Sequence, residues 1–396
     1  MKRFIFVFTI VITLALSEGN AQENGIRFNN KPWSEILTMA KKENKLIFLD
    51  AYASWCGPCK WMAANMFTND TVADFYNKTF ICASFDMEKG EGIQLRRQYE
   101  VRAYPTLLFI DGDGNMIHRK VGAERKAIAY VNIGNTALDP QKCLSSYIRK
   151  YESGNYPEDY LPVYLQALTD AYLPVESVLQ KYFASASGDQ IYDQESWIII
   201  NRFVTDMNSP LFAFVVKNRA EYVKRYSQDT VFMKISTVYV NGLLRSSRDI
   251  HFTDSSYRAL QEKIRQTGYE EADKVFFYSD LSLYQFRGEK DKFLELAYEK
   301  MDKFYHDDYN MLNNIAWSVQ QMTNDKKYLD KALSWAKRSI ALQNEPFNND
   351  TYAIIQLKLG NKEEAIKYEK IALQLARKKN ESASVYEDTL KKMMQP

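Results

Sequence analysis

Two cysteines separated by two residues, Cys56 and Cys59, are the residues of this sequence best suited to chemistry. They follow an apolar run at 45–52 that predicts a buried strand, and Pro58 suits the first turn of a helix. A cysteine at a helix start faces free backbone N–H groups and the positive end of the helix dipole, which lower its pKa. We therefore predict that the Cys56 thiolate attacks a disulfide and that Cys59 resolves the mixed disulfide.

Two other interpretations fit a pair of cysteines at this spacing: half of a zinc site, or a structural disulfide. Zinc needs about two further ligands, but Cys82 and Cys143 are isolated and the three histidines are scattered along the chain. A disulfide-stapled scaffold is usually short and rich in cysteine, whereas this chain has 396 residues and four cysteines. We expect no metal and no cofactor.

An acid and a proline stand near this pair. Asp50 lies within the apolar run, six residues before Cys56. Burial would raise its pKa and make it a proton acceptor for Cys59; the alternative is a half-exposed strand end. Pro105 follows Tyr104 and precedes an apolar strand at 106–110. It is either an ordinary trans proline or a cis one.

The segment around the cysteines, WCGPC, resembles the active-site segment of the thioredoxin family, with Trp55 before Cys56 and Lys60 after Cys59. The resemblance covers about residues 33–136. It implies a redox-active Cys56–Cys59 disulfide, a buried acid at Asp50 and a cis-proline at Pro105. The residues that it implies contact the substrate are Trp55, Gly57, Pro58, Tyr104 and Pro105. Thioredoxins have a lysine where this chain has Cys82, which we expect to be a small buried core residue.

The elements expected around these residues predict an α/β thioredoxin fold over 24–137. Helices are expected at 31–44, 70–76, 88–100 and 125–136, and strands at 45–52, 80–85, 106–110 and 115–121. The Asp-Gly-Asp-Gly sequence at 111–114 predicts a hairpin turn between the last two strands. The order is that of a βαβ unit followed by a β-hairpin and a covering helix.

Residues 138–396 are predicted to form an all-helical domain. Two helical patterns recur 33 residues apart, aligning Ala332 with Ala365 and Ser339 with Ala372, close to the period of tetratricopeptide (TPR) repeats. We therefore expect TPR-like repeats at about 288–379, whereas 140–288 shows no clear period. Such repeats form a surface for peptides or protein partners, or an array that only packs on the catalytic domain.

The N-terminus predicts export. Lys2 and Arg3 precede an apolar stretch at 4–16, and Gly19 and Ala21 suit cleavage after residue 21. Residues 1–21 are thus expected to be a signal peptide, or alternatively an uncleaved anchor, and the expected compartment is the bacterial periplasm. No later segment reads as an integral membrane span, and a net charge of +2 gives no reason to expect nucleic-acid binding.

Together these patterns predict an exported thiol–disulfide oxidoreductase that reduces, or relays electrons to, disulfides in exported proteins. The Gly57–Pro58 dipeptide resembles reducing thioredoxins. The expected partners are protein substrates with disulfides or thiols and an electron-donating redox partner. Two alternatives stay open: the same site acting as an oxidase or isomerase, and a partner-binding adaptor whose thioredoxin-like domain is a docking module.

Overall fold

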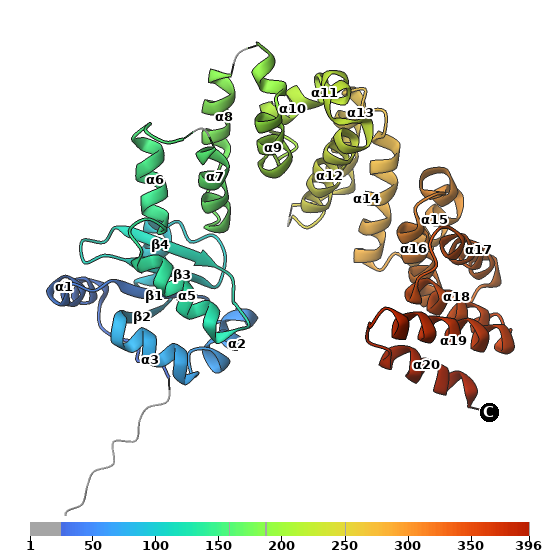
Figure 1. The fold of residues 1–396 in the computed structure, drawn as a ribbon, viewed down its shortest axis with the longest axis horizontal. Coiled ribbons are helices and arrows are strands. Elements are labelled where there is room, and N and C mark those ends of the chain that lie inside the picture. The colour runs from blue at the N-terminus through green and yellow to red at the C-terminus, as the bar shows by residue number, and fades with distance from the viewer. Residues whose placement is uncertain (1–24, 158, 187, 250, 396) are drawn as a thin grey trace, which may run out of the picture. The chain divides into compact units, whose positions relative to one another are not determined.

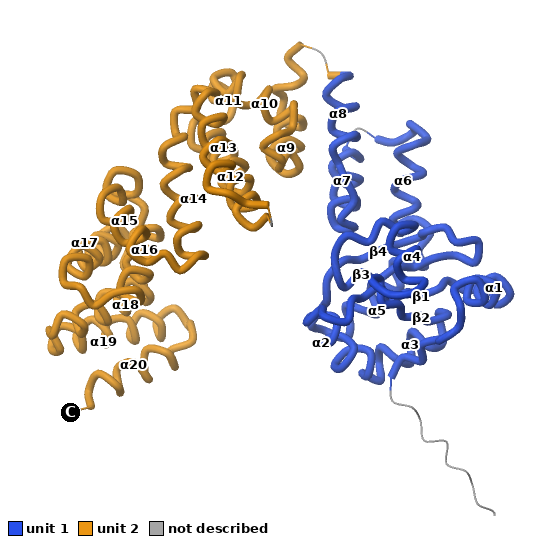
Figure 2. The backbone as a smooth tube through the Cα atoms, turned by 180° about the vertical axis from the view of Figure 1, so that it is seen from behind, with its two compact units in different colours: residues 1–185 blue, residues 186–396 orange. Residues whose placement is uncertain are grey.

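The computed structural model describes residues 25–157, 159–186, 188–249 and 251–395 (Figure 1). The predicted signal peptide at 1–21 lies outside them. The chain divides into two compact units, residues 1–185 and 186–396 (Figure 2). The division falls at residue 185, three helices after the domain boundary predicted at 137. That boundary therefore stays a prediction.

The first unit is built on a four-stranded sheet in the order β2-β1-β3-β4. Its strands are β1 (Ile47–Tyr52), β2 (Ile81–Asp86), β3 (Thr106–Ile110) and β4 (Met116–Val121). β1 pairs in parallel with β2, while the pairs β1–β3 and β3–β4 are antiparallel. This is the predicted βαβ unit followed by a hairpin, and the α/β fold is confirmed. β1 and β3 are apolar along most of their length because both faces of the sheet are covered.

Helices cover the two faces of this sheet (Figure 1). On one face, α1 (Trp33–Glu43) and α4 (Gly92–Gln98) contribute Ile36 and Leu95 to a core that also contains Leu49. On the other, α3 (Asp70–Thr79) and α5 (Ala127–Leu138) contribute Tyr76 and Tyr130 to a second core that is rich in aromatic residues. This second core contains Phe48, Phe67, Tyr76, Phe80, Phe109 and Tyr130. α2 (Gly57–Asn65) begins at the residue after Cys56 and fixes the position of that cysteine.

The helix expected at 88–100 is shorter than predicted. It begins only at Gly92, because residues 87–91 form turns in which Gly90 has a φ of 51°. A Cβ at Gly92 would lie 2.0 Å from the backbone oxygen of Asp86, so only glycine fits where α4 approaches the end of β2.

Three more helices complete the first unit: α6 (Leu144–Glu152), α7 (Tyr160–Asp170) and α8 (Glu176–Ser185). The backbone N–H of Leu144, at the start of α6, donates to Nδ1 of His118 on β4 at 3.3 Å. Burial lowers the pKa of His118 to about 4, so the imidazole is neutral and free to accept this bond. The bond ties α6 to the edge of the sheet.

The second unit contains helices and no strand among the residues described for it. They are η1 (Gly188–Tyr192), α9 (Gln194–Phe203), α10 (Pro210–Lys217), α11 (Arg219–Tyr226), α12 (Gln228–Ser246), α13 (Asp254–Gln266), α14 (Ala272–Arg287), α15 (Lys290–Tyr305), α16 (Tyr309–Met322), α17 (Lys326–Leu342), α18 (Pro346–Lys358), α19 (Lys362–Lys378) and α20 (Ser384–Met394). Within the described parts of the chain, no helix is both long and apolar enough to cross a membrane.

The 33-residue recurrence coincides with two helices of equal length, α17 and α19, of 17 residues each. Ala332 and Ala365 are fully buried, as are Ser339 and Ala372. The aligned residues therefore occupy equivalent inward positions on the two helices. The assignment of these helices to a TPR-like class stays a prediction.

Candidate functional site

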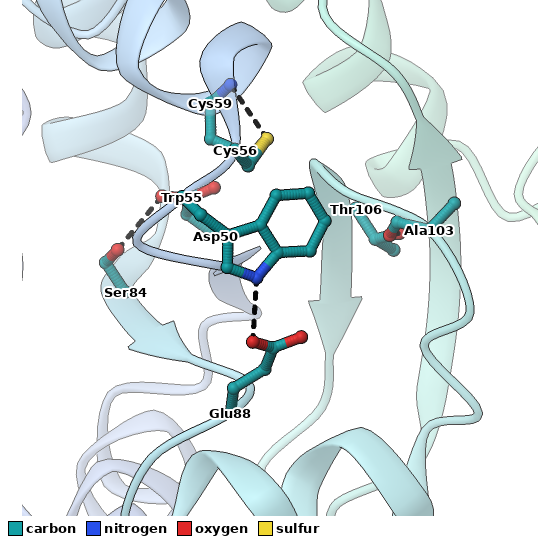
Figure 3. Close-up of a disulfide and its surroundings, with 8 residues drawn as sticks. All are labelled: Asp50, Trp55, Cys56, Cys59, Ser84, Glu88, Ala103 and Thr106. Carbon is teal, nitrogen blue, oxygen red and sulfur yellow. Dashed lines mark hydrogen bonds between the residues drawn. A yellow bond between two sulfur atoms is a disulfide. The ribbon is translucent and has the colours of Figure 1, made fainter. Parts of the chain in front are cut away.

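Cys56 is the N-cap of α2, and it forms a disulfide with Cys59 (Figure 3). The backbone N–H of Cys59 donates to Sγ of Cys56 at 3.1 Å. In the reduced protein this N–H and the α2 dipole would face the Cys56 thiolate, which both stabilise. Gly57 and Pro58, the residues between the cysteines, are exposed in the first turn, while both cysteines are buried.

Asp50 is buried in β1, with 5 % of its surface exposed, which excludes the alternative of a half-exposed strand end. In the strand register it lies opposite Ser84 on β2, whose Oγ donates to Oδ2 of Asp50 at 2.9 Å. Oδ1 of Asp50 is buried and has no hydrogen-bond partner in the part of the chain that is described. Burial raises the pKa of Asp50 to about 7, although the Ser84 bond opposes this increase. Near neutral pH the carboxyl group can therefore both hold and release a proton.

The Tyr104–Pro105 peptide bond is cis, as the resemblance implies. Tyr104 packs against the small cluster formed by Ala53, Cys56 and Cys59. The carbonyl oxygen of Pro105 accepts a hydrogen bond from the N–H of Gly122 at 2.9 Å. These contacts place the start of β3 beside the disulfide.

Trp55 is the most exposed large apolar residue of this region, with 66 % of its surface accessible. Its Nε1 donates to Oε2 of Glu88 at 2.8 Å (Figure 3), and its ring meets that of Tyr104 edge-on at 5.9 Å. Trp55 and Tyr104 thus form an aromatic surface next to the cysteines. The roles of Glu88 and Ser84 were not predicted from the sequence, although the parallel pairing of β1 with β2 would place Ser84 beside Asp50.

The other two cysteines lie apart from this site. Cys82 pairs in register with Phe48, two residues from Asp50 along β1, and its Sγ is 3.6 Å from the carbonyl oxygen of Tyr76. Burial raises the pKa of the Cys82 thiol to about 12. It is a free, buried core residue, as expected, and Cys143 is also free and buried.

Comparison with known proteins agrees with this geometry. The Thioredoxin family model matches residues 26–132. Thioredoxin H4 of Arabidopsis thaliana is 35% identical over 109 residues, which cover 28% of this chain and 87% of that protein. Thioredoxin-T of Drosophila melanogaster is 34% identical over 87 residues, which cover 22% of this chain and 52% of that protein.

Two further matches are to proteins named for disulfide chemistry. The thiol:disulfide interchange protein DsbD of Yersinia pestis is 30% identical over 105 residues, covering 25% of this chain and 18% of that protein. The solution structure of a putative disulphide-isomerase from Bacteroides thetaiotaomicron has 44% sequence identity and a TM-score of 0.27, covering 29% of this chain and 97% of that one. The chain thus spans about half of Thioredoxin-T and under a fifth of DsbD.

Each of these relatives matches between 22% and 29% of the chain, and the residues matched by the family model contain the disulfide. On the match to Thioredoxin H4, the chain belongs to the thioredoxin family, and its Cys56–Cys59 site supports thiol–disulfide oxidoreductase activity.

Proposed function

We propose that this protein is an exported oxidoreductase that reduces, or relays electrons to, disulfides in exported proteins. One observation carries the proposal. The Cys56 sulfur lies at the N-terminus of α2, close to Tyr104, which precedes the cis proline. Asp50 is buried in β1, the strand that leads to the cysteines.

The reaction begins with the reduced protein. The Cys56 thiolate attacks one sulfur of the substrate disulfide, a mixed disulfide forms, and the other substrate sulfur leaves as a thiolate. The Asp50 carboxylate accepts the proton of Cys59, whose sulfur then attacks Cys56 and releases the second substrate thiolate. Two electrons pass to the substrate, the Cys56–Cys59 disulfide forms, and an electron-donating partner must restore the dithiol.

Substrate binding is assigned to the exposed surface around the disulfide. Trp55, Gly57 and Pro58 present an apolar surface on the α2 side. On the other side, the backbone of Tyr104, next to Pro105, is available to pair with an extended substrate peptide as in strand addition. Such pairing reads the backbone and therefore tolerates many substrate sequences.

We place the catalytic domain at 24–137 and assign partner recruitment to the helices of 138–396, including the TPR-like repeats at 288–379. Export rests on the basic and apolar pattern of residues 1–21. Mass spectrometry of the full chain expressed in a bacterium tests it. A periplasmic product that begins at Gln22 supports export with cleavage, and a product that keeps residues 1–21 contradicts the cleavage.

Reduction of insulin in the presence of dithiothreitol tests the enzymatic activity. The wild-type protein should accelerate insulin precipitation, and Cys56→Ser should abolish the acceleration. Cys143→Ser is the matched control, because it removes a thiol at another helix N-cap where serine is also a good capping residue. Equal rates for wild-type and Cys56→Ser proteins would refute the proposal.

A trapping variant separates the enzyme from an adaptor. Cys59→Ala should accumulate mixed disulfides between Cys56 and its substrates, because the resolving thiol is gone. If a protein with both cysteines replaced captures the same partners, the thioredoxin-like domain is a docking module. The redox state of the cysteines in the cell then gives the direction of electron flow, since a reductase is kept mainly as the dithiol.

A further inference from the structure

A hollow of about 400 Å³ lies along α4 and the turn that follows it. It is lined by Ile93, Arg96, Arg97, Glu100, Val101 and Arg102. Val101 is buried, whereas Ile93 has 41 % of its surface exposed. The wall of the hollow is therefore partly apolar, and three of its six residues are arginines.

This hollow is connected to the active site through Arg96. The Arg96 guanidinium lies over the ring of Tyr104, at 5.9 Å from the ring centre. Tyr104 in turn contacts the cysteine cluster and the ring of Trp55. The Tyr104 hydroxyl is buried and has no hydrogen-bond partner among the described residues. Arg96 therefore packs against Tyr104, the residue that precedes the cis-proline.

The carboxylates near the hollow already have partners. Glu100 pairs with Arg102 at 2.8 Å, and Glu88 accepts the bond from Trp55. Glu91 accepts a hydrogen bond from the backbone N–H of Trp33 at 3.2 Å. The side chains of Arg96 and Arg97, in contrast, are exposed.

Within the described residues, Arg96 and Arg97 have no ion pair, and the one carboxylate on the wall of the hollow is held by Arg102. Among the described residues, the hollow therefore presents two positive charges that have no ion-pair partner, beside the apolar side chains of Ile93 and Val101. The positive charge of the hollow complements carboxylates, and the apolar part of its wall suits an apolar side chain. The hollow therefore fits a polypeptide segment that carries both.

We propose that this hollow is a subsite for an acidic segment of the polypeptide substrate, next to its reacting cysteine. The inference rests on the proposed function, because it assumes that the substrate pairs beside Tyr104 and Pro105. An extended chain advances about 3.3 Å per residue, so a carboxylate a few residues from the substrate cysteine reaches Arg96 and Arg97. The subsite selects substrates through their flanking charge, while Cys56 and Cys59 carry out the exchange.

The test uses three synthetic peptides of equal length, each closed by one internal disulfide. They differ only in the residues that flank one cysteine, which are Glu, Gln or Lys. With the reduced protein at low salt, we expect kcat/KM for the Glu peptide to exceed that for the Gln peptide by about three- to tenfold, mainly through KM, as two exposed ion pairs would give. The Lys peptide should react more slowly than the Gln peptide.

Variants locate the effect. Arg96→Gln with Arg97→Gln should bring the Glu and Gln peptides within about twofold of each other, and 0.5 M salt should do the same to the wild type. Arg96→Lys with Arg97→Lys should keep most of the preference, because the charge is retained. Lys42→Gln with Lys78→Gln is the matched control. These exposed lysines lie shortly before β1 and β2, at the end of the sheet opposite the cysteines, and should leave the preference unchanged.

The outcomes separate this inference from the function on which it rests. If wild-type protein reduces the Gln peptide and Cys56→Ser does not, the proposed function is supported whatever the charge preference. Equal rates for the Glu and Gln peptides, or a preference that survives in the Gln double variant, overturn the acidic subsite alone. Failure of the wild type to reduce any of the three peptides overturns both.

Discussion

The carboxyl group of Asp50 should make the sheet of the first unit less stable as pH rises. Its ordinary pKa is 3.8 and burial raises the pKa to about 7. Below pH 3.8 the group is protonated in both folded and unfolded chains, so its stabilising contribution is complete. Between pH 3.8 and 7 the unfolded chain releases the proton first, and stability is lost. At about 1.4 kcal/mol per pKa unit the loss reaches about 4 kcal/mol above pH 7.

Asp50→Asn removes this dependence, because an amide is neutral at every pH and its oxygen can accept the bond from Ser84 Oγ. The oxidised variant should be more stable than the oxidised wild type by about 4 kcal/mol at pH 8 and by less than about 1 kcal/mol at pH 4. The same variant should resolve mixed disulfides more slowly, because Cys59 loses its proton acceptor.

Hydrogen exchange of peptides from β1 and β3 measures the opening of this sheet without unfolding the helical unit. Wild type and variant are compared at the same pH, so that intrinsic exchange rates cancel. Ser84→Ala is the control that removes the hydrogen bond and keeps the carboxyl group, so its stability should still fall as pH rises. If the two proteins show parallel stability from pH 4 to pH 8, or if the variant is the less stable one at pH 8, the assignment of a neutral buried carboxyl group to Asp50 is wrong.

Three further predictions concern other residues. Ser84→Ala should raise the pKa of Asp50 further, because it removes the hydroxyl group that donates to Oδ2. The pH profile of mixed-disulfide resolution should then move to higher pH. An unchanged profile would contradict the role of Asp50 in proton transfer. Gly92→Ala should destabilise the first unit by about 1–3 kcal/mol in thermal unfolding, since its Cβ would meet the Asp86 backbone, and a neutral effect would show that α4 shifts freely. Glu369 on α19 is fully buried, and burial and the charge of Asp350 on α18 both raise its pKa. The α18–α19 pair should therefore lose stability as pH rises, and Glu369→Gln should reduce this loss. Hydrogen exchange of the two helices measures their stability at each pH. An identical pH dependence in both proteins would show that Glu369 is already ionised.

The sequence predicted the cysteines and Asp50 locally, because a helix start and a charged residue in an apolar strand are both visible within a few positions. The residues alone left Pro105 either cis or trans, and its cis bond was implied only by the resemblance to the thioredoxin family. Ser84 was not predicted as the partner of Asp50, because that pairing depends on the register of two strands separated by α2 and α3. The stacking of Arg96 on Tyr104 likewise depends on how α4 is oriented after the turn at Gly90.

Between 140 and 288 the sequence predicted helices but no repeat, because no clear period recurs there. Glu369 was missed for a different reason: charged residues are expected on exposed faces. It nevertheless lies four residues after Ala365 and three before Ala372, both of which were identified as repeat positions. Helical periodicity alone would therefore have placed Glu369 on the buried face of α19.

The burial of Cys82 limits how many electrons this protein can carry. A thiol with a pKa of about 12, enclosed by the aromatic core behind the sheet, is neither ionised nor accessible to a substrate near neutral pH. Cys143 is buried at the start of α6. Of the four cysteines, we expect only Cys56 and Cys59 to exchange, so each molecule should carry one pair of electrons at a time. A small aromatic disulfide reagent should accordingly titrate two thiols in the folded, reduced protein and all four only after it is unfolded.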